Sequence, residues 1–241
     1  MKSYSLPLPL VAALTVDIAR NRPRSLLQDS RDLLASLTPP PCIEGVEHIP
    51  ASGGCAIIYN HYERPGLWIG FAGAMLITAV AQRQGDRAVP LHMLVIDRAL
   101  IQLARHEVEL PFSRFFLKRV AHIWGMLPLS AAAQDTARRA ASLKQALSLV
   151  RQRRPIAIAP EGAIRGDRGL QAAVPGTGAF LQLLSRRGAP LVPAGIWEEG
   201  DRLYARLGEP FGLTSADDAS TRAEVMGRIA ALLPQRMRGG N

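Results

Sequence analysis

One stretch decides the fold: residues 56–61, read as AIIYNH, pass directly from a compact apolar run to an asparagine and a histidine. A second stretch, residues 156–162 or IAIAPEG, repeats the arrangement with a glutamate between a proline and a glycine. Short apolar runs of this kind are typical of buried strands, so both polar signatures lie where strands end. Because open α/β sheets build their sites at strand ends, we predict that His61 and Glu161 meet at one edge of a sheet.

Strand and helix patterns alternate along the rest of the chain. Strands are predicted at 91–96, 190–196 and 203–207, and helices at 24–37, 136–154, 177–187 and from 221 onward. This alternation predicts a single α/β domain, residues 42–241, with a mixed, mostly parallel sheet flanked by helices. Residues 1–41 are predicted to form an N-terminal helical extension that ends in the Pro-rich linker TPPP at 38–41.

Side-chain spacing adds detail to three of these helices. Leucines on one side of the helix at 24–37 favour a role in covering the core over a position on a membrane surface. In the helix at 136–154 the predicted inward residues are Ala140, Leu143, Leu147 and Val150. The last helix is predicted to open with a capping box formed by Thr221 and Glu224.

Residues 65–82 are 18 consecutive uncharged residues, bounded by Arg64 and Arg83, and this length reaches the lower limit for a membrane-spanning helix. Pro65 and Gly66 would begin that helix, and its glycines weaken it. Since a span here would place the sheet at the membrane, a helix of the core or the interface is favoured.

Charge narrows the range of partners. The chain has 241 residues, 29 Lys+Arg against 20 Asp+Glu, and 48% apolar residues, so a folded core and an anionic partner are both expected. Few aromatics and no recognised nucleic-acid motif argue against nucleic acid, which leaves an anionic membrane surface, a phosphate-bearing substrate, or a solvated surface without a specific partner. Residues 110–120 interleave phenylalanines with basic residues, as interfacial surfaces do.

Compartment and metal content are also constrained. The apolar run at 6–16 carries two prolines and no clear cleavage site, so we expect a peripheral protein at the cytoplasmic face of the membrane. The two cysteines, Cys42 and Cys55, make neither a disulfide framework nor a metal quartet and are expected to be buried thiols. No metal and no resident cofactor are therefore expected.

Two residues are the main candidates for chemistry. The first is His61, because a histidine can accept a proton near neutral pH, although a lone histidine is more often structural. Glu161 gains nothing from packing after a buried strand and would need a polar partner there. Arg165, in the loop after Gly162, offers donors for an anion.

Short motifs follow one another in order over about residues 43–212: GVEHIP at 45–50, NH at 60–61, LPF at 110–112 leading to GMLPL at 125–129, APEG at 159–162, LVPA at 191–194 and GEP at 208–210. Taken in this order, they resemble the motifs of the glycerolipid and lysophospholipid acyltransferases, a superfamily that includes the 1-acylglycerol-3-phosphate acyltransferases. Each motif is short and common, but their order and spacing together are specific.

The resemblance implies transfer of a fatty acyl group from acyl-CoA or acyl carrier protein to a lipid hydroxyl. It implies that His61 is the base and that Glu161, Gly162 and Arg165 bind the polar end of the acceptor. The family's catalytic aspartate would fall at Gly66, and the arginine expected after Gly125 is also absent. Glu63 or a backbone carbonyl is the candidate group for orienting the imidazole in place of that aspartate.

Two other functions fit the same residues. A lipid- or acyl-chain-binding protein that keeps the fold without catalysis would explain the missing aspartate and arginine. A basic nucleic-acid binder is the weaker alternative, and it would require a steep salt dependence of oligonucleotide binding.

Overall fold

The computed structural model describes residues 3–85, 89–97, 100–103, 106–109, 111–130, 136–162 and 169–238. Within them, one sheet has seven strands in the order β1-β9-β8-β2-β7-β3-β6. The bounds are β1 (Cys42–Glu44), β2 (Ala56–Tyr59), β3 (His92–Ile96), β6 (Leu127–Leu129), β7 (Ile156–Ile158), β8 (Leu191–Glu199) and β9 (Arg202–Leu207). Neighbouring strands are parallel except β8 and β9, which form an antiparallel hairpin. The predicted single α/β domain with a mostly parallel sheet is confirmed.

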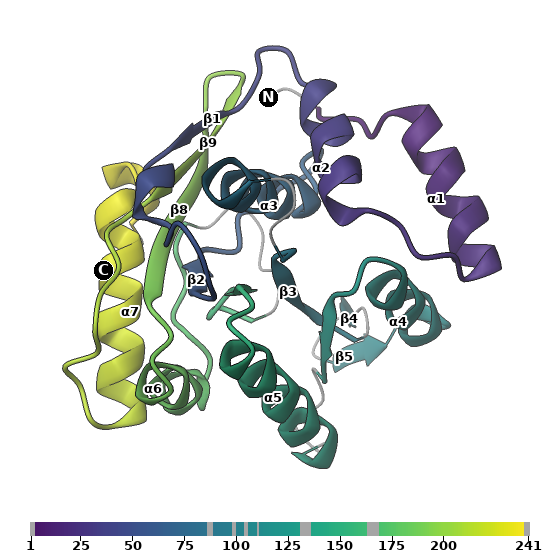
Figure 1. Cartoon of the computed structure of the whole chain (residues 1–241). Helices are drawn as coiled ribbons and strands as arrows, with labels where there is room; N and C mark the ends of the chain where they lie inside the picture. Colours follow the sequence, from purple (N-terminus) through teal and green to yellow (C-terminus); the bar gives the residue numbers. More distant parts are fainter. Residues whose placement is uncertain are drawn as a thin grey trace.

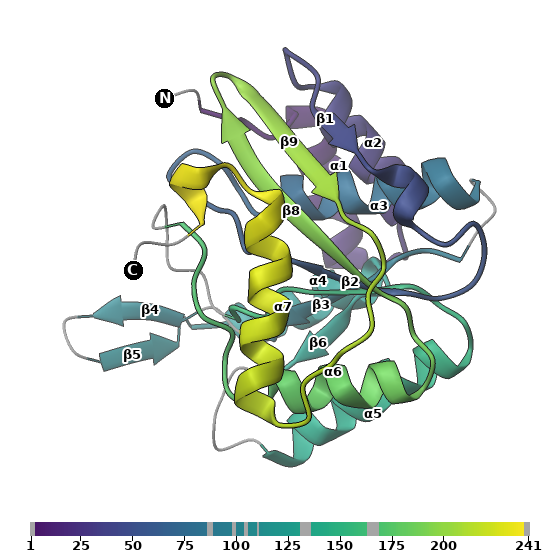
Figure 2. The same cartoon turned by 90° about the vertical axis from the view of Figure 1, so that its left-hand side faces the viewer.

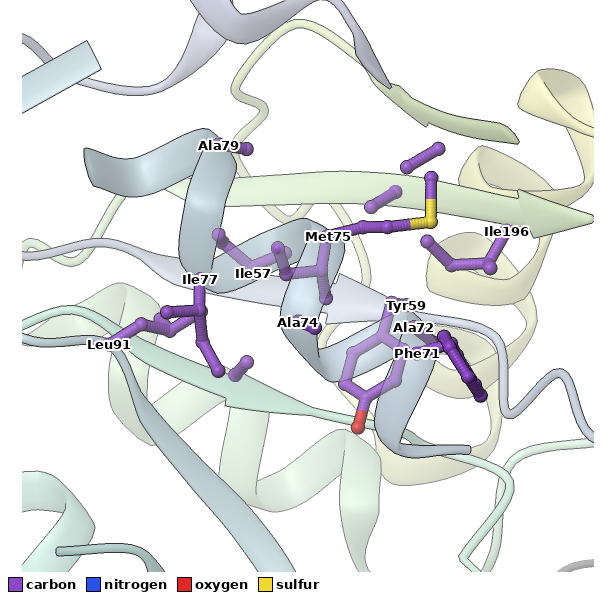
Figure 3. Packing of buried hydrophobic residues seen from close by; sticks show 14 of the residues in the cluster. Ile57, Tyr59, Phe71, Ala72, Ala74, Met75, Ile77, Ala79, Leu91 and Ile196 are labelled. Atoms are coloured by element: carbon purple, nitrogen blue, oxygen red, sulfur yellow. The ribbon is translucent and has the colours of Figure 1, made fainter. Parts of the chain in front are cut away.

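Helices cover both faces of this sheet (Figures 1 and 2). One face carries α2 (Leu26–Ala35) and α3 (Gly70–Gln84), and the other carries α5 (Thr136–Arg151), α6 (Thr177–Arg186) and α7 (Asp218–Leu232). Alternation along β2 serves both layers, because Ile57 and Tyr59 join the first cluster whereas Ala56 and Ile58 join the second. Figure 3 shows the first cluster, in which α3 lies over β2.

Two helices and one two-stranded hairpin lie outside these layers. The helices α1 (Leu8–Arg20) and α4 (Ser113–Ile123) lie side by side at one edge of the molecule (Figure 1), where Arg119 Nε donates to the Ile18 carbonyl at 2.8 Å. The strands β4 (Leu100–Leu103) and β5 (His106–Glu109) pair as a separate antiparallel hairpin (Figure 2).

The N-terminal extension divides into two unlike helices. Ser25 caps α2 by accepting from the backbone N–H of Gln28, and Leu33 and Leu34 of α2 are buried in the same cluster as α3. The helix α1, which the sequence reasoning did not identify, buries none of its residues. The covering role predicted for 24–37 is therefore what α2 performs.

The long uncharged segment forms a core helix that begins later than predicted. Residues 65–69 are a loop, and α3 starts at Gly70 and buries ten of its residues, from Phe71 to Ala81. The predicted start at Pro65 is wrong because Gly66 adopts a left-handed φ of 78°, which a helix cannot contain. Across the described ranges, no helix is long and apolar enough to cross a bilayer.

The capping box predicted for α7 is wrong. The cap of α7 is Asp217, which accepts from the Ser220 backbone N–H at 2.9 Å, whereas Thr221 lies buried inside the helix. Glu224 instead accepts from the backbone N–H groups of Thr214 and Ser215, in the preceding loop. An aspartate earlier in the chain therefore forms the cap before the predicted box is reached.

Three of the four residues predicted to face inward on α5 do face the core, and Ala140 is the exception. Ala140 is exposed, and the buried residues are Ala146, Leu149 and Val150, with Leu143 and Leu147 partly buried against the same cluster. The reason is that α5 reaches the core through its second half, so Ala140 in the first half has no core to face.

The two free cysteines differ in burial. Cys55 is buried as predicted, whereas Cys42 is only partly buried.

Candidate active site

The loop that follows β2, residues 60–67 and here called the His61 loop, begins with a buried asparagine. Asn60 Nδ2 donates to the Ile196 carbonyl at 2.8 Å, and the Ile196 backbone N–H donates to Asn60 Oδ1 at 2.6 Å. The side-chain amide thus continues the β2–β8 pairing for one more step after Tyr59, which pairs with Ala194. Because both amide groups are satisfied, Asn60 fixes where the strand ends and where His61 begins.

His61 and Glu161 come together as the sequence predicted, through the histidine backbone. The His61 N–H donates to Glu161 Oε1 at 2.7 Å, and the Gln171 N–H donates to Glu161 Oε2 at 2.8 Å. Glu161 is 8% exposed, so its carboxylate is a buried bridge between the tips of β2 and β7 and the segment at 171. Both oxygens accept backbone hydrogen bonds, and this places Glu161 as a group that holds the histidine in position.

The His61 imidazole is set up to accept a proton. Its Nδ1 atom is buried and makes no hydrogen bond within the described residues. Burial lowers the pKa of His61 from its ordinary value of 6.5, so the ring is neutral at pH 7. A neutral imidazole that already has its backbone fixed is the form a general base requires.

Glu63, the predicted orienting carboxylate, lies in the same loop, two residues after His61. Its Oε2 atom is buried and has no hydrogen-bond partner in the described part of the chain, and burial raises its pKa. It lines an open pocket of about 520 Å³ whose walls are Tyr4, Leu6 and residues 63–68. His61 and Glu161 are not lining residues of this pocket, so the orienting role of Glu63 stays a prediction.

Two glycines of the site have conformations that require glycine. Gly66, where the resemblance would place the aspartate, has a φ of 78°, and a Cβ there would lie 3.1 Å from the Ser3 Oγ. Gly162 has a φ of 75°, and its Cβ would lie 3.0 Å from a methyl group of Val174. The predicted substrate contact of Gly162 stays a prediction, and Arg165 lies outside the described residues.

The structure adds polar residues that the sequence reasoning missed. Asp97 and Ser130 directly follow β3 and β6, are buried, and so lie at the same carboxyl edge as His61 and Glu161. The signal was available, because each is a polar residue that ends an apolar run. Arg64 and Glu198 were also missed, and they form a buried ion pair at 2.6 Å between the His61 loop and β8.

The described residues contain no group of three or more His, Cys, Asp and Glu side chains arranged to hold a metal ion. At the strand tips, a neutral imidazole whose backbone is held by Glu161 lies at the carboxyl edge of a mostly parallel sheet. Such a site suits a reaction that starts with removal of a proton from a hydroxyl.

Comparisons with known proteins agree with this description. A family model described as Acyltransferase matches residues 41–197, which is more than half of the chain. A similar solved structure is the 1-acyl-sn-glycerophosphate (LPA) acyltransferase PlsC from Thermotoga maritima, with a TM-score of 0.51 and 14% sequence identity, covering 90% of this chain and 78% of that one. At that identity the structural likeness concerns the fold alone. A comparison with curated protein sequences gives no match.

The fold and the family match therefore define the class: an α/β acyltransferase whose candidate site lies at the carboxyl ends of the strands. The chain belongs to the acyltransferase family, and its matched region runs from the residue before β1 into β8.

Proposed function

We propose that this protein transfers a fatty acyl group from acyl-CoA or acyl carrier protein to a hydroxyl of a glycerolipid or another lipid acceptor. The observation that carries the proposal is His61 itself: a partly buried, neutral imidazole whose backbone is bound by Glu161 at the tip of β2. Family membership supports the reaction class, and the donor and acceptor follow from the motif resemblance.

In the proposed reaction, His61 takes the proton of the acceptor hydroxyl as that oxygen attacks the thioester carbonyl. The C–S bond then breaks, the new ester remains on the acceptor, and the leaving thiolate receives the proton from the imidazolium. Glu161 keeps the His61 backbone in place throughout, because its two oxygens accept hydrogen bonds from the His61 and Gln171 N–H groups. The predicted contact of Glu161 with the polar end of the acceptor stays a prediction. Base catalysis of this kind contributes roughly 10² to 10⁴ in rate.

The test is acyl transfer by the purified protein, with labelled acyl-CoA or acyl carrier protein and a panel of lysophospholipids, glycerol phosphate and simple lipid alcohols. His61→Ala should lower kcat by roughly 10²- to 10⁴-fold. The matched control is His48→Ala, since the His48 imidazole lies within 2.9 Å of the Leu207 carbonyl, away from the His61 loop. Turnover that is unchanged in His61→Ala would remove the histidine from the mechanism.

A second function is supported by a specific observation, the glycine at position 66 together with the unpartnered Nδ1 of His61. Without a carboxylate to orient the ring, the same fold could bind lipid or acyl chains without transferring them. Vesicle or acyl-chain binding that is unaffected by His61→Ala, with no transfer to any acceptor in the panel, would favour this function over the first.

The lipid acceptor implies a membrane partner, and we propose peripheral attachment to an anionic membrane through one exposed surface. This surface, here called the apolar edge, consists of Leu8, Val11 and Val16 of α1 and Phe112, Phe115 and Phe116 at the start of α4. Phe112 is 87% exposed and Phe115 65%, and Lys118 and Arg119 follow them in sequence. Exposed aromatics with adjacent cations are typical of surfaces that insert into the headgroup region.

Sedimentation with vesicles that contain phosphatidylglycerol tests the attachment. The double variant Phe115→Ser/Phe116→Ser should lose most of its binding, and Val174→Ser, an exposed apolar residue elsewhere, should retain it. Equal binding by the two variants would exclude the apolar edge as the contact.

A further inference from the structure

Arg64 lies three residues after His61 and is almost fully buried. Its side chain is 2% exposed and binds Glu198 of β8 through two hydrogen bonds, Nε to Oε2 at 2.6 Å and Nη2 to Oε1 at 2.6 Å. A third donor, Nη1, reaches the Pro65 carbonyl at 2.8 Å. The guanidinium therefore binds both its own loop and the neighbouring strand.

Tyr4 of the N-terminal segment also binds this ion pair. The Tyr4 hydroxyl donates to Glu198 Oε1 at 2.8 Å, and the Tyr4 backbone N–H donates to the Gly66 carbonyl at 2.7 Å. The ring of Tyr4 packs against Phe71 at a centroid distance of 5.8 Å, and the Arg64 guanidinium lies 5.5 Å from its centre. Tyr4 thus contacts both the His61 loop and the carboxylate that holds it.

Strand β8 binds the His61 loop at two points. Asn60 is bound to the backbone of Ile196, and Arg64 is bound to the side chain of Glu198, two residues further along the same strand. Residues 61–63 span the distance between these two points. Glu161 adds one more contact, to the His61 N–H. The path of the backbone at His61 is thus determined from both sides, and loss of the Arg64 contact would leave it fixed from one side only.

A buried ion pair is weak evidence for stability. Removing two charges from water costs several kcal/mol per ion, and well-packed apolar residues of similar volume are often as stable or more so. Burial would raise the pKa of Glu198, but the hydrogen bonds from Arg64 and Tyr4 outweigh it and lower that pKa. Glu198 is therefore a charged carboxylate whose oxygens accept hydrogen bonds from Arg64 and Tyr4. This directional geometry specifies one conformation of the His61 loop.

We infer that Tyr4, Arg64 and Glu198 form a positioning unit that holds the His61 imidazole in the orientation used for acyl transfer. This inference rests on the proposed function, in which His61 is the base. Tyr4 and Glu198 lie outside residues 41–197, the region that the family model matches. Through Tyr4 of the N-terminal segment and Glu198 of β8, the unit restrains the His61 loop. Gly66 of that loop has no side chain that could do so.

Tyr4→Phe is the sharpest test, because it removes one hydroxyl and keeps the ring packing. We expect kcat to fall about tenfold with KM within about twofold, since a small misplacement of a base lowers turnover without weakening binding. Arg64→Lys, which keeps the charge but loses the two-point geometry, should lower kcat about a hundredfold. The controls are Tyr204→Phe, whose ring stacks on Trp197, and Glu199→Gln, whose partner Arg236 forms an exposed pair at 3.1 Å.

A second readout does not depend on turnover. The His61 imidazole is titrated by NMR in the wild type, in Tyr4→Phe and in the two controls. If the unit positions the loop, the pKa of His61 rises toward 6.5 in Tyr4→Phe, because a loosened ring becomes hydrated, and stays at the wild-type value in the controls.

The two proposals fail in different ways. A wild-type protein that transfers no acyl group to any acceptor overturns the proposed function, and the NMR titration still decides whether the unit orients the ring. A Tyr4→Phe variant with wild-type kcat and an unchanged His61 titration overturns the positioning unit while the enzyme assignment stands. A fall in kcat that Tyr204→Phe or Glu199→Gln reproduces overturns it as well.

Discussion

The His61 loop and the apolar edge are held by opposite kinds of contact. Buried polar groups hold the loop, namely Asn60, Glu161 and the Arg64–Glu198 pair, whereas α1 buries none of its residues and Phe112 is 87% exposed. Buried polar contacts are directional and expensive to break, so they define one geometry. Exposed apolar side chains define no geometry and gain free energy only when something covers them. The comparison separates the region suited to chemistry from the region suited to contact with a surface.

The largest effect should come from breaking the ion pair on one side only. Arg64→Met leaves Glu198 buried without its partner and should lower the free energy of unfolding by about 3–5 kcal/mol. The double variant Arg64→Met/Glu198→Leu should recover much of that loss, since no charge remains buried. Urea unfolding measures both. The contrast is Arg206→Met, whose pair with Glu44 is exposed and is worth about 0–1 kcal/mol. Equal losses for Arg64→Met and Arg206→Met would contradict the distinction.

Glu161→Gln should have the next largest effect. Only one oxygen of the new amide can accept a hydrogen bond, so either the His61 or the Gln171 N–H loses its acceptor. An unsatisfied buried donor costs about 1–3 kcal/mol, and the unfolding free energy should fall by that amount. The comparison is Glu224→Gln on α7, whose carboxylate also accepts from two backbone N–H groups but is only partly buried, so the substitution should cost less. A smaller loss at Glu161 than at Glu224 would count against the bridging role.

The unfolding free energy of the protein should depend on pH through the titratable groups of the site. Because the folded-state pKa of His61 lies below 6.5, the unfolded chain binds more protons in that interval, so the unfolding free energy rises as pH rises through it and is level above about 6.5. Glu63 and Glu161, whose folded-state pKa values are raised above 4.5 by burial, act in the opposite sense in a window above pH 4.5. The unfolding free energy is measured by urea unfolding at a series of pH values for the wild type and for His61→Asn, and the difference between the two isolates the contribution of His61. A difference that does not change with pH would contradict this prediction.

The smallest effect is expected at the apolar edge. Phe112 has a left-handed φ of 60°, which is strained for a residue with a side chain, and it is almost fully exposed. Phe112→Gly should leave stability unchanged or raise it by up to about 1 kcal/mol, because glycine accepts that φ. Binding to anionic vesicles should fall at the same time. A clear loss of stability would show that the ring has packing contacts and that the two regions are less distinct than described.

Pattern reasoning succeeded where one local signal had one structural consequence. Short apolar runs became β2 and β7, and the polar residues behind them met at one edge because parallel strands share their carboxyl ends. It failed where two local signals competed or where the partner was distant. Asp217 formed the cap of α7 before the Thr221 and Glu224 pattern was reached, and Ala140 lies on a part of α5 that reaches no core.

The sequence by itself determined the fold class, the strand tips that carry His61 and Glu161, and the family, since these depend on apolar periodicity and on motif order. Only the tertiary structure decided that Glu161 binds the His61 backbone, that Glu63 Oε2 is buried without a hydrogen-bond partner among the described residues, and that Tyr4 and Arg64 both bind Glu198. The physical reason is distance along the chain. Tyr4 and Glu198 are 194 positions apart, and a hydrogen bond between such residues follows from packing, on which local spacing has no bearing.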